Sequence, residues 1–178
     1  APAPVSPAAS GGLKAAGAGD TGAGAGDFDF LIGHWRVRHR VLRKGSQRDW
    51  MEFEGTSSTR KVLGGQGNIE ENLLASPAGA YHAMAIRSFD AKSAEWSIWW
   101  LDGRFPLGPL DPPVRRRFQD GVGAFYSDDL VDGKSRRTRY LWSKITPATC
   151  QWDQATSNDQ GATWETNWVM AFNRVAPR

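Results

Sequence analysis

The sequence predicts an all-β protein, folded as an antiparallel up-and-down barrel of about ten strands with a short N-terminal 3-10 or helical turn. Three observations favour this class. Apolar and polar residues alternate with a period of two over most of the chain, short turns separate these segments, and almost no segment has helical periodicity. A β-sandwich is the main alternative. The barrel is favoured because nearly every connection is a short hairpin, and because closure removes exposed sheet edges.

The elements follow from this alternation in chain order. Residues 27–35 contain apolar side chains at the spacing of one helical or 3-10 turn. The first strand covers residues 35–43, with Trp35, Val37 and His39 on one face and arginines on the other. Nine further strands are expected from the same pattern, at residues 49–62, 69–76, 81–90, 95–104, 114–119, 122–129, 135–145, 149–157 and 163–175.

The connections carry turn signals. Asp120-Gly121 and Asp132-Gly133 are typical of tight hairpins. The glycine-rich residues 64–67 are expected to form a loop at the mouth of the barrel. Residues 157–164, SNDQGATW, resemble the Asp-box of sialidase-type propellers, but the pattern occurs once and 178 residues are too few for a propeller. We therefore expect a hairpin turn held by side-chain hydrogen bonds.

The chain divides into a tail and one domain. Residues 1–26 are almost entirely Ala, Gly, Pro and Ser, so a disordered tail is expected there, followed by a single barrel domain over residues 27–178. The Ala-Pro-Ala-Pro start is consistent with a terminus exposed by signal-peptide cleavage. We therefore expect an exported protein, periplasmic or secreted, with a cytoplasmic protein as the alternative.

Composition argues against several function classes. The net charge is only +3 and charges of both signs are interspersed. The arginines in residues 115–117 and 136–139 alternate between strand faces, so nucleic acid is not an expected partner. Cys150 is the single cysteine, and no Cys/His spacing suits a metal or another cofactor. No apolar run reaches the roughly 20 residues of an integral membrane segment. A homodimer remains one open alternative for the assembly.

Gly33-His34-Trp35 resembles the Gly-x-Trp signature of the lipocalins and the wider calycin group. That resemblance implies a Trp that closes one end of the barrel and packs against a basic residue of the last strand, for which Arg174 is the candidate. Over residues 27–175 the chain resembles a family of bacterial domains of unknown function with a lipocalin-like barrel. The segments that carry this resemblance are DFLIGHW, FEGTSS, LGGQGNIEEN, WSIWWLDGR, DGVGAFYSDD and SNDQGATWETNWVMAFNR.

The chain is also distantly similar to nitrobindin-type barrels. That family binds haem iron through a histidine near its C-terminal end. The last histidine of this chain is His82, so haem is not expected and no cofactor is assigned.

Nine tryptophans favour a cavity lined by indoles, the usual composition of a small-molecule site. The expected ligand-binding residues are aromatic or polar side chains in inward phase or at the strand ends, namely His39, Asn72, Trp100, Asp102, Arg104, Trp142, Gln154 and Trp168. The expected function is binding of a small apolar or aromatic ligand. One alternative is an isomerase, cyclase or lyase using His39 or Asp102 as acid/base. The other is a structural protein with a filled barrel.

Overall fold

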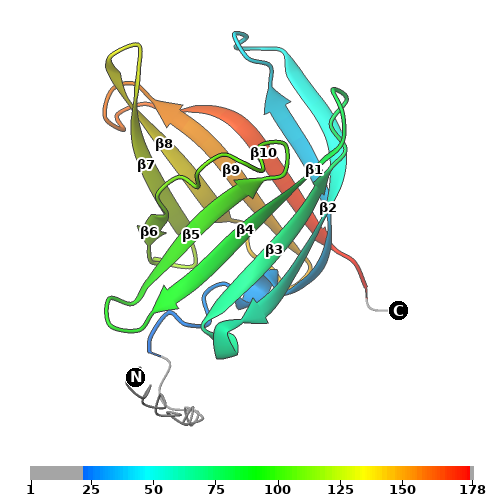
Figure 1. The fold of residues 1–178 in the computed structure, drawn as a ribbon, viewed down its shortest axis with the longest axis vertical. Coiled ribbons are helices and arrows are strands. Elements are labelled where there is room, and N and C mark those ends of the chain that lie inside the picture. The colour runs from blue at the N-terminus through cyan, green and yellow to red at the C-terminus, as the bar shows by residue number, and fades with distance from the viewer. Residues whose placement is uncertain (1–21, 177–178) are drawn as a thin grey trace, which may run out of the picture.

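The computed structural model describes residues 22–176 and confirms the all-β class (Figure 1). Ten antiparallel strands form one sheet, in the order β6-β5-β4-β3-β2-β1-β10-β9-β8-β7. The elements in chain order are η1 Asp29–Leu31, β1 Gly33–Leu42, β2 Trp50–Val62, η2 Leu63–Gly65, β3 Gly67–Leu74, β4 Tyr81–Asp90, β5 Glu95–Asp102, β6 Val114–Arg116, β7 Gly123–Val131, β8 Lys134–Ser143, β9 Thr149–Ser157 and β10 Glu165–Arg174.

Pairing of the first and last strands closes the sheet into an up-and-down, lipocalin-like barrel. β1 pairs with β10 from Trp35 opposite Arg174 to Val41 opposite Trp168. The remaining seam lies between β6 and β7. There the guanidinium carbon of Arg116 lies 5.0 Å from the Tyr126 ring centre. The barrel is therefore nearly closed.

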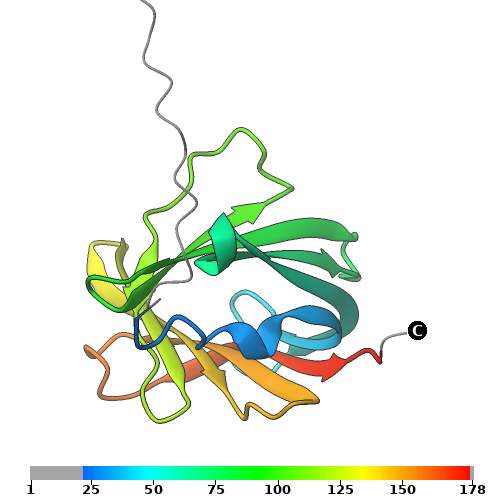
Figure 2. The same cartoon turned by 90° about the horizontal axis from the view of Figure 1, so that it is seen from below.

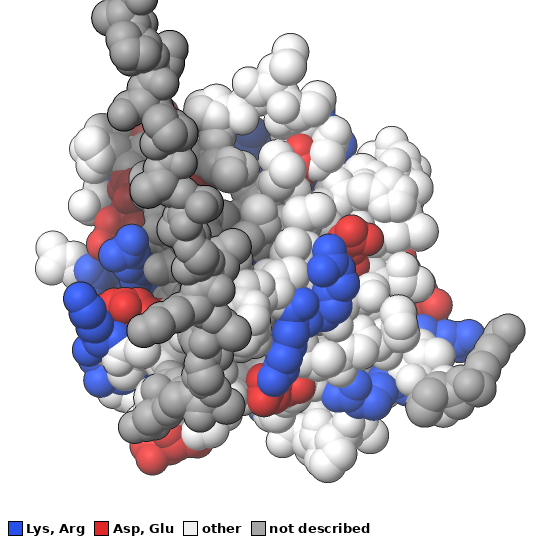
Figure 3. Space-filling model, turned by 60° about the horizontal axis from the view of Figure 1, so that its bottom comes forward, with Lys and Arg blue, Asp and Glu red and all other residues white. Residues whose placement is uncertain are grey.

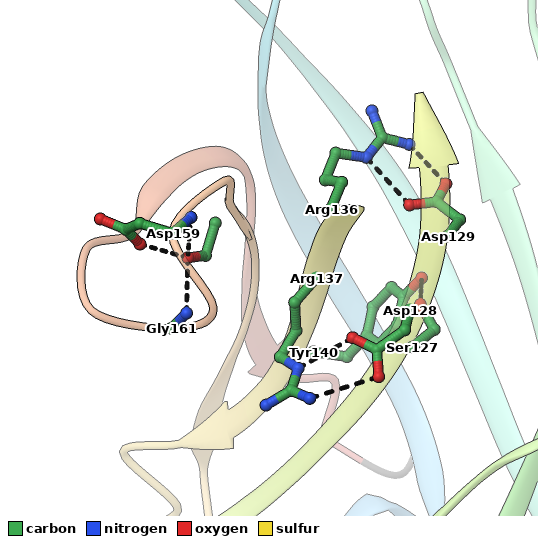
Figure 4. Close-up of polar contacts among 9 residues, drawn as sticks. Ser127, Asp128, Asp129, Arg136, Arg137, Tyr140, Asp159 and Gly161 are labelled. Carbon is green, nitrogen blue, oxygen red and sulfur yellow. Dashed lines mark hydrogen bonds and ion pairs between the residues drawn. The ribbon is translucent and has the colours of Figure 1, made fainter. Parts of the chain in front are cut away.

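The predicted turns are confirmed. Asp120-Gly121 and Asp132-Gly133 have positive φ at both positions, as tight hairpins between right-twisted strands require. In the β9–β10 turn, the Ser157 hydroxyl accepts a bond from the Gly161 N–H at 2.8 Å and donates to Asp159 at 2.7 Å (Figure 4). Hydrogen bonds from Thr163, and then from Ser157, lower the pKa of Asp159 to about 2. The Asp-box-like stretch therefore forms a hairpin turn held by side-chain hydrogen bonds.

The glycine-rich connection between β2 and β3 lies at the same end of the barrel as η1. Thr59, near the end of β2, pairs with Gly33 at the start of β1, and Lys61 forms an ion pair of 3.2 Å with Asp29 of η1. The expectation that residues 64–67 sit at the mouth is therefore wrong. Alternation predicted the strands correctly, but it carries no information on which barrel end η1 closes.

The segment around η1 closes this lower end of the barrel (Figures 1 and 2). Phe28 is fully buried, with its ring edge-on to Trp96 at 5.0 Å and to Phe118 at 4.9 Å between ring centres. The indole N–H of Trp96 donates to the Gly24 carbonyl at 2.9 Å, so residues 22–26 contact the barrel. The disordered tail was expected over residues 1–26. Residues 1–21 of it, and the terminus that motivates export, lie outside the described residues.

Arg174 locks the closed end. Its guanidinium carbon lies 4.1 Å from the centre of the Trp35 ring, the cation–π pair that the Gly-x-Trp resemblance implied. The same guanidinium donates to the carbonyls of Phe30 at 2.7 Å, Ile32 at 2.6 Å and Pro147 at 2.9 Å. Trp35 in turn donates to the Leu31 carbonyl at 2.9 Å. One side chain thus ties β10 to β1, to η1 and to the β8–β9 turn.

Replacing Arg174 by methionine should lower the free energy of unfolding by about 2–4 kcal/mol. The change keeps the aliphatic length but removes the cation–π pair and leaves carbonyls without donors. Urea denaturation at pH 7 measures the loss. Arg136→Met is the matched control, because Arg136 pairs only with exposed Asp129 and should change stability little. Equal losses of unfolding free energy in the two variants would contradict this role of Arg174.

Candidate functional site

The inward-facing side chains form two zones along the barrel. Near η1 they are buried, and we call this set the closed-end core: Phe28, Leu31, Trp35, Val37, Phe89, Trp96, Phe125, Trp142, Cys150, Met170 and Phe172. Towards the other end, many inward-facing side chains remain partly accessible, although Leu74 and Thr138 there are buried. We call the partly accessible set the open-end wall: Met51, Phe53, Tyr81, Ile98, Trp100, Asp102, Ser127, Tyr140, Trp152, Gln154 and Trp168. Within residues 22–176, the partly accessible inward side chains therefore lie mainly towards the end of the barrel opposite η1, and Ile98, Tyr140, Trp152 and Trp168 among them also pack against the closed-end core.

Three aromatic side chains on β8, β9 and β10 dominate one side of the open-end wall. Tyr140 and Trp152 stack with ring centres 6.1 Å apart, and Trp152 meets Trp168 edge-on at 5.1 Å. Some polar atoms of these side chains already have partners in the barrel wall. The Tyr140 hydroxyl, for example, lies 3.2 Å from that of Ser127 (Figure 4). These three rings, named here the aromatic wall, present ring faces and edges to the interior.

His39 is buried beside this wall with 1 % exposure. Its Nδ1 accepts a hydrogen bond from the Trp168 indole at 3.1 Å, and its ring stacks on Phe53 with centres 4.7 Å apart. Burial lowers the pKa of His39 to about 4. The imidazole is therefore neutral at pH 7 and, because Nδ1 is an acceptor, its proton is on Nε2.

A set of buried polar side chains on β2, β3 and β4 is named here the polar wall: Ser57, Thr59, Asn68, Glu70, Asn72 and Arg87. Arg87 donates to Asn68 at 2.9 Å and forms an ion pair with Glu70, whose other oxygen accepts from Ser57 at 2.9 Å. Arg87 also lies 4.9 Å from the Phe28 ring centre, against the closed-end core. The two buried charges are thus paired with each other, as burial of ions requires.

Several atoms of the polar wall have no hydrogen-bond partner among residues 22–176. Both amide atoms of Asn72 are unpaired, and so are Asn68 Nδ2, Thr59 Oγ1 and Arg87 Nε. Asn72 is only 2 % exposed. A buried polar group without a hydrogen-bond partner is unfavourable, so these unpaired atoms lower the free energy of unfolding.

The eight predicted site residues lie at different depths in the barrel and at its rim. His39 and Asn72 are buried within the barrel, and Trp100, Gln154 and Trp168 belong to the open-end wall. Trp142 lies lower, in the closed-end core. Their roles as ligand contacts remain predictions.

Asp102 and Arg104 lie together where β5 ends. Their side chains form an ion pair of 2.8 Å, and hydrogen bonding from Arg104 holds the pKa of Asp102 below its usual value. The Arg104 guanidinium also covers the Tyr81 ring at 3.7 Å from its centre. The pair thus braces the rim of the open end, in the turn after β5.

Sequence reasoning missed most of the polar wall. Asn68, Glu70 and Asn72 alternate along β3, and this period of two was the available signal. The missing information was strand register, which places Asn68 opposite Arg87 and Asn72 opposite Ser57.

His39, Asp102 and Cys150 are poorly suited to acid/base chemistry near neutral pH. A general acid or base works best with a pKa near the working pH. The pKa of His39 is about 4, and Asp102 is held ionised by Arg104. Burial, followed by the nearby Glu70 carboxylate, raises the pKa of Cys150 to about 12, so its thiol stays protonated. Over residues 22–176, no group of three or more His, Cys, Asp or Glu side chains could hold a metal ion.

The outer surface offers weaker candidates for a functional site than the barrel interior. A hollow of about 480 Å³ lies at the closed end, against Phe30, Phe118 and Ile145, away from the open-end wall. On the face in Figure 3, basic and acidic side chains lie beside one another. The helices of the described chain are too short to span a bilayer.

No family model and no curated protein matches the chain. Among solved structures it is similar to the S-type phycobiliprotein lyase CPES from Guillardia theta, with a TM-score of 0.52. The match covers 85 % of this chain and 92 % of that chain at 11 % sequence identity. At this identity the likeness shows the fold alone. Fold and comparison together define a lipocalin-like barrel protein, while the resemblances to a bacterial domain family and to nitrobindin stay predictions.

The buried neutral state of His39 predicts a pH-dependent stability. An unfolded histidine binds a proton near pH 6.5, whereas His39 in the folded chain does so only at about 4. As the pH falls through this window the unfolded chain binds more protons, so stability falls, by an amount on the order of 2–3 kcal/mol, and levels off below it. Urea denaturation at intervals from pH 7.5 to about 4 measures this loss.

The His39→Gln variant should lack this component, so its stability should approach that of the wild type as the pH falls. His82→Gln, at an exposed position of β4, is the control and should follow the wild-type curve. A gap between wild type and His39→Gln that stays constant with pH would show that His39 is not held neutral.

Proposed function

We propose that this protein binds a small, largely apolar or aromatic ligand in the open half of the barrel. The observation that carries the proposal is the open-end wall. Its side chains face inward in register with the closed-end core, yet they remain partly accessible. A ligand seated there would cover this surface, and burial of apolar area is the main favourable term in such binding.

The chemistry of the wall supports an aromatic or flat apolar ligand. Trp100 faces inward in register with Ala85 and is 42 % exposed. Across the barrel, the aromatic wall of Tyr140, Trp152 and Trp168 offers ring faces and edges at stacking distances. The similarity to a lyase with the same barrel fold is compatible with this proposal and adds no ligand identity.

The filled-barrel alternative receives less support. A structural barrel packed to its ends would bury its inward side chains as fully as Phe125 or Phe172, which are at most 1 % exposed. An enzyme is not favoured by a specific observation, because His39 and Asp102 have pKa values displaced away from neutrality.

The proposal is tested with N-phenyl-1-naphthylamine, an apolar aromatic probe whose fluorescence rises when it leaves water. We expect saturable binding to the wild type with a stoichiometry of one. Trp100→Ala should weaken binding roughly three- to ten-fold, since an aromatic contact contributes about 0.5–1.5 kcal/mol. Trp99→Ala is the matched control, because the neighbouring residue of β5 points to the opposite face and should leave binding unchanged.

Two results would contradict the proposal. One is the absence of saturable binding of the probe. The other is an equal loss in Trp99→Ala and Trp100→Ala, which would place the probe on the outer surface or reflect loss of the fold. Circular dichroism of both variants distinguishes the last two cases.

A further inference from the structure

We propose that Asn72 recognises an uncharged amide-type group of the ligand, one that offers both a carbonyl acceptor and an N–H donor. This inference rests on the proposed function and specifies the ligand's polar end. Its basis is the unpaired state of the Asn72 side chain in the middle of the barrel, together with the charge and the small size of the residues around it.

The Asn72 carboxamide is complementary to such a group. It carries one acceptor oxygen and one NH₂ donor, and neither atom has a protein partner within the described chain although the residue is 2 % exposed. Burial without partners makes the empty site unfavourable. A ligand amide supplies a donor to Oδ1 and an acceptor to Nδ2 at once, which satisfies both atoms with a single group.

The neighbours of Asn72 on the inward face are small. It lies opposite Ser57 on β2 and opposite Ala83 on β4. Gly55 is its diagonal neighbour on β2, and a Cβ added there would come within 3.1 Å of His39 Nε2. The residues that flank Asn72 in register are therefore small, and His39 Nε2, a second N–H donor, lies close to Gly55.

The charges nearby exclude an ionic ligand group at this position. Arg87 is the cation of the polar wall, and it is paired with Glu70. Among the described residues of this wall, an anionic group would find no unpaired cation, because Glu70 already neutralises Arg87 and leaves only its Nε–H without a partner, and a cationic group would find no unpaired carboxylate, because Arg87 and Ser57 bind the two Glu70 oxygens. Buried ions require a partner, whereas an uncharged amide requires only hydrogen bonds.

The geometry of the barrel gives the ligand an orientation. Four strands lie between β3, which carries Asn72, and β8, which carries Tyr140, in the sheet order, so these two strands lie on opposite sides of the barrel (Figure 2). An aromatic body against the aromatic wall can direct its polar edge to Asn72. Because the Asn72 amide is covered in the empty barrel, binding includes displacement of the side chains that cover it.

The test uses two ligands of the same shape, naphthalene-2-carboxamide and 2-acetylnaphthalene, which differ by an NH₂ in place of a CH₃. Each is titrated as a competitor of N-phenyl-1-naphthylamine. We expect the wild type to prefer the amide about ten-fold, because the ketone leaves Asn72 Oδ1 unpaired. Asn72→Leu should remove this preference while retaining the ketone and the fluorescent probe. It should also raise the melting temperature of the unliganded protein, because two buried unpaired atoms are removed.

Asn173→Leu is the control, since Asn173 is exposed on β10, and it should change neither the preference nor the melting temperature. An unchanged preference in Asn72→Leu, or equal affinities in the wild type, would overturn the inference while the proposed function stands. A lower melting temperature of Asn72→Leu would also overturn it, because Asn72 would then already be satisfied in the empty barrel. If the fluorescent probe itself does not bind, the proposed function fails and the inference fails with it.

Discussion

The contact between Arg174 and Trp35 is the constraint on which the rest of the barrel depends. Arg174 ends the last strand and Trp35 lies near the start of the first, and their side chains meet at 4.1 Å across the pair that closes the sheet. Hydrogen bonds from the same guanidinium to Phe30 and Ile32 hold the η1 segment across that end. The same side chain therefore closes both the sheet and one end of the barrel.

The two zones of the interior follow from this one-sided closure. Phe28, carried just before η1, packs under Trp96 and Phe118 and excludes solvent from the lower half. No comparable segment of the described chain covers the upper half, so Trp100 stays partly exposed although it faces inward. The closed-end core supplies the burial that stabilises the fold, which leaves the open-end wall available for a ligand.

The polar wall lies between these zones and explains why polarity is tolerated inside the barrel. Arg87 and Glu70 neutralise one another, with Ser57 and Asn68 completing most of their hydrogen bonds. The side chain of Asn72, one register step nearer the open end, has no such partners in the described part of the chain. The contrast between a satisfied ion pair and an unsatisfied amide separates a structural network from a candidate recognition group.

Much of the fold could be predicted from local sequence because a strand exposes alternate residues to opposite faces. Trp35, Val37 and His39 were correctly assigned to the interior on that ground, and the Asp-Gly pairs correctly predicted hairpins. The site was harder to predict. Trp142 has the same inward phase as Tyr140, two residues before it, but lies in the closed-end core, because depth along the barrel axis depends on strand tilt and register.

The sequence by itself determined the class, the approximate strands, the inward face of each strand and the Arg–Trp pairing implied by Gly-x-Trp. These features depend on neighbours a few residues apart or on a short motif. Only the tertiary structure decided that the β2–β3 connection lies at the closed end, that Asp102 is engaged by Arg104, and that Asn68 and Glu70 have a common partner in Arg87 while Asn72 has none. Those outcomes depend on register between strands distant in the chain, which alternation within one strand cannot encode.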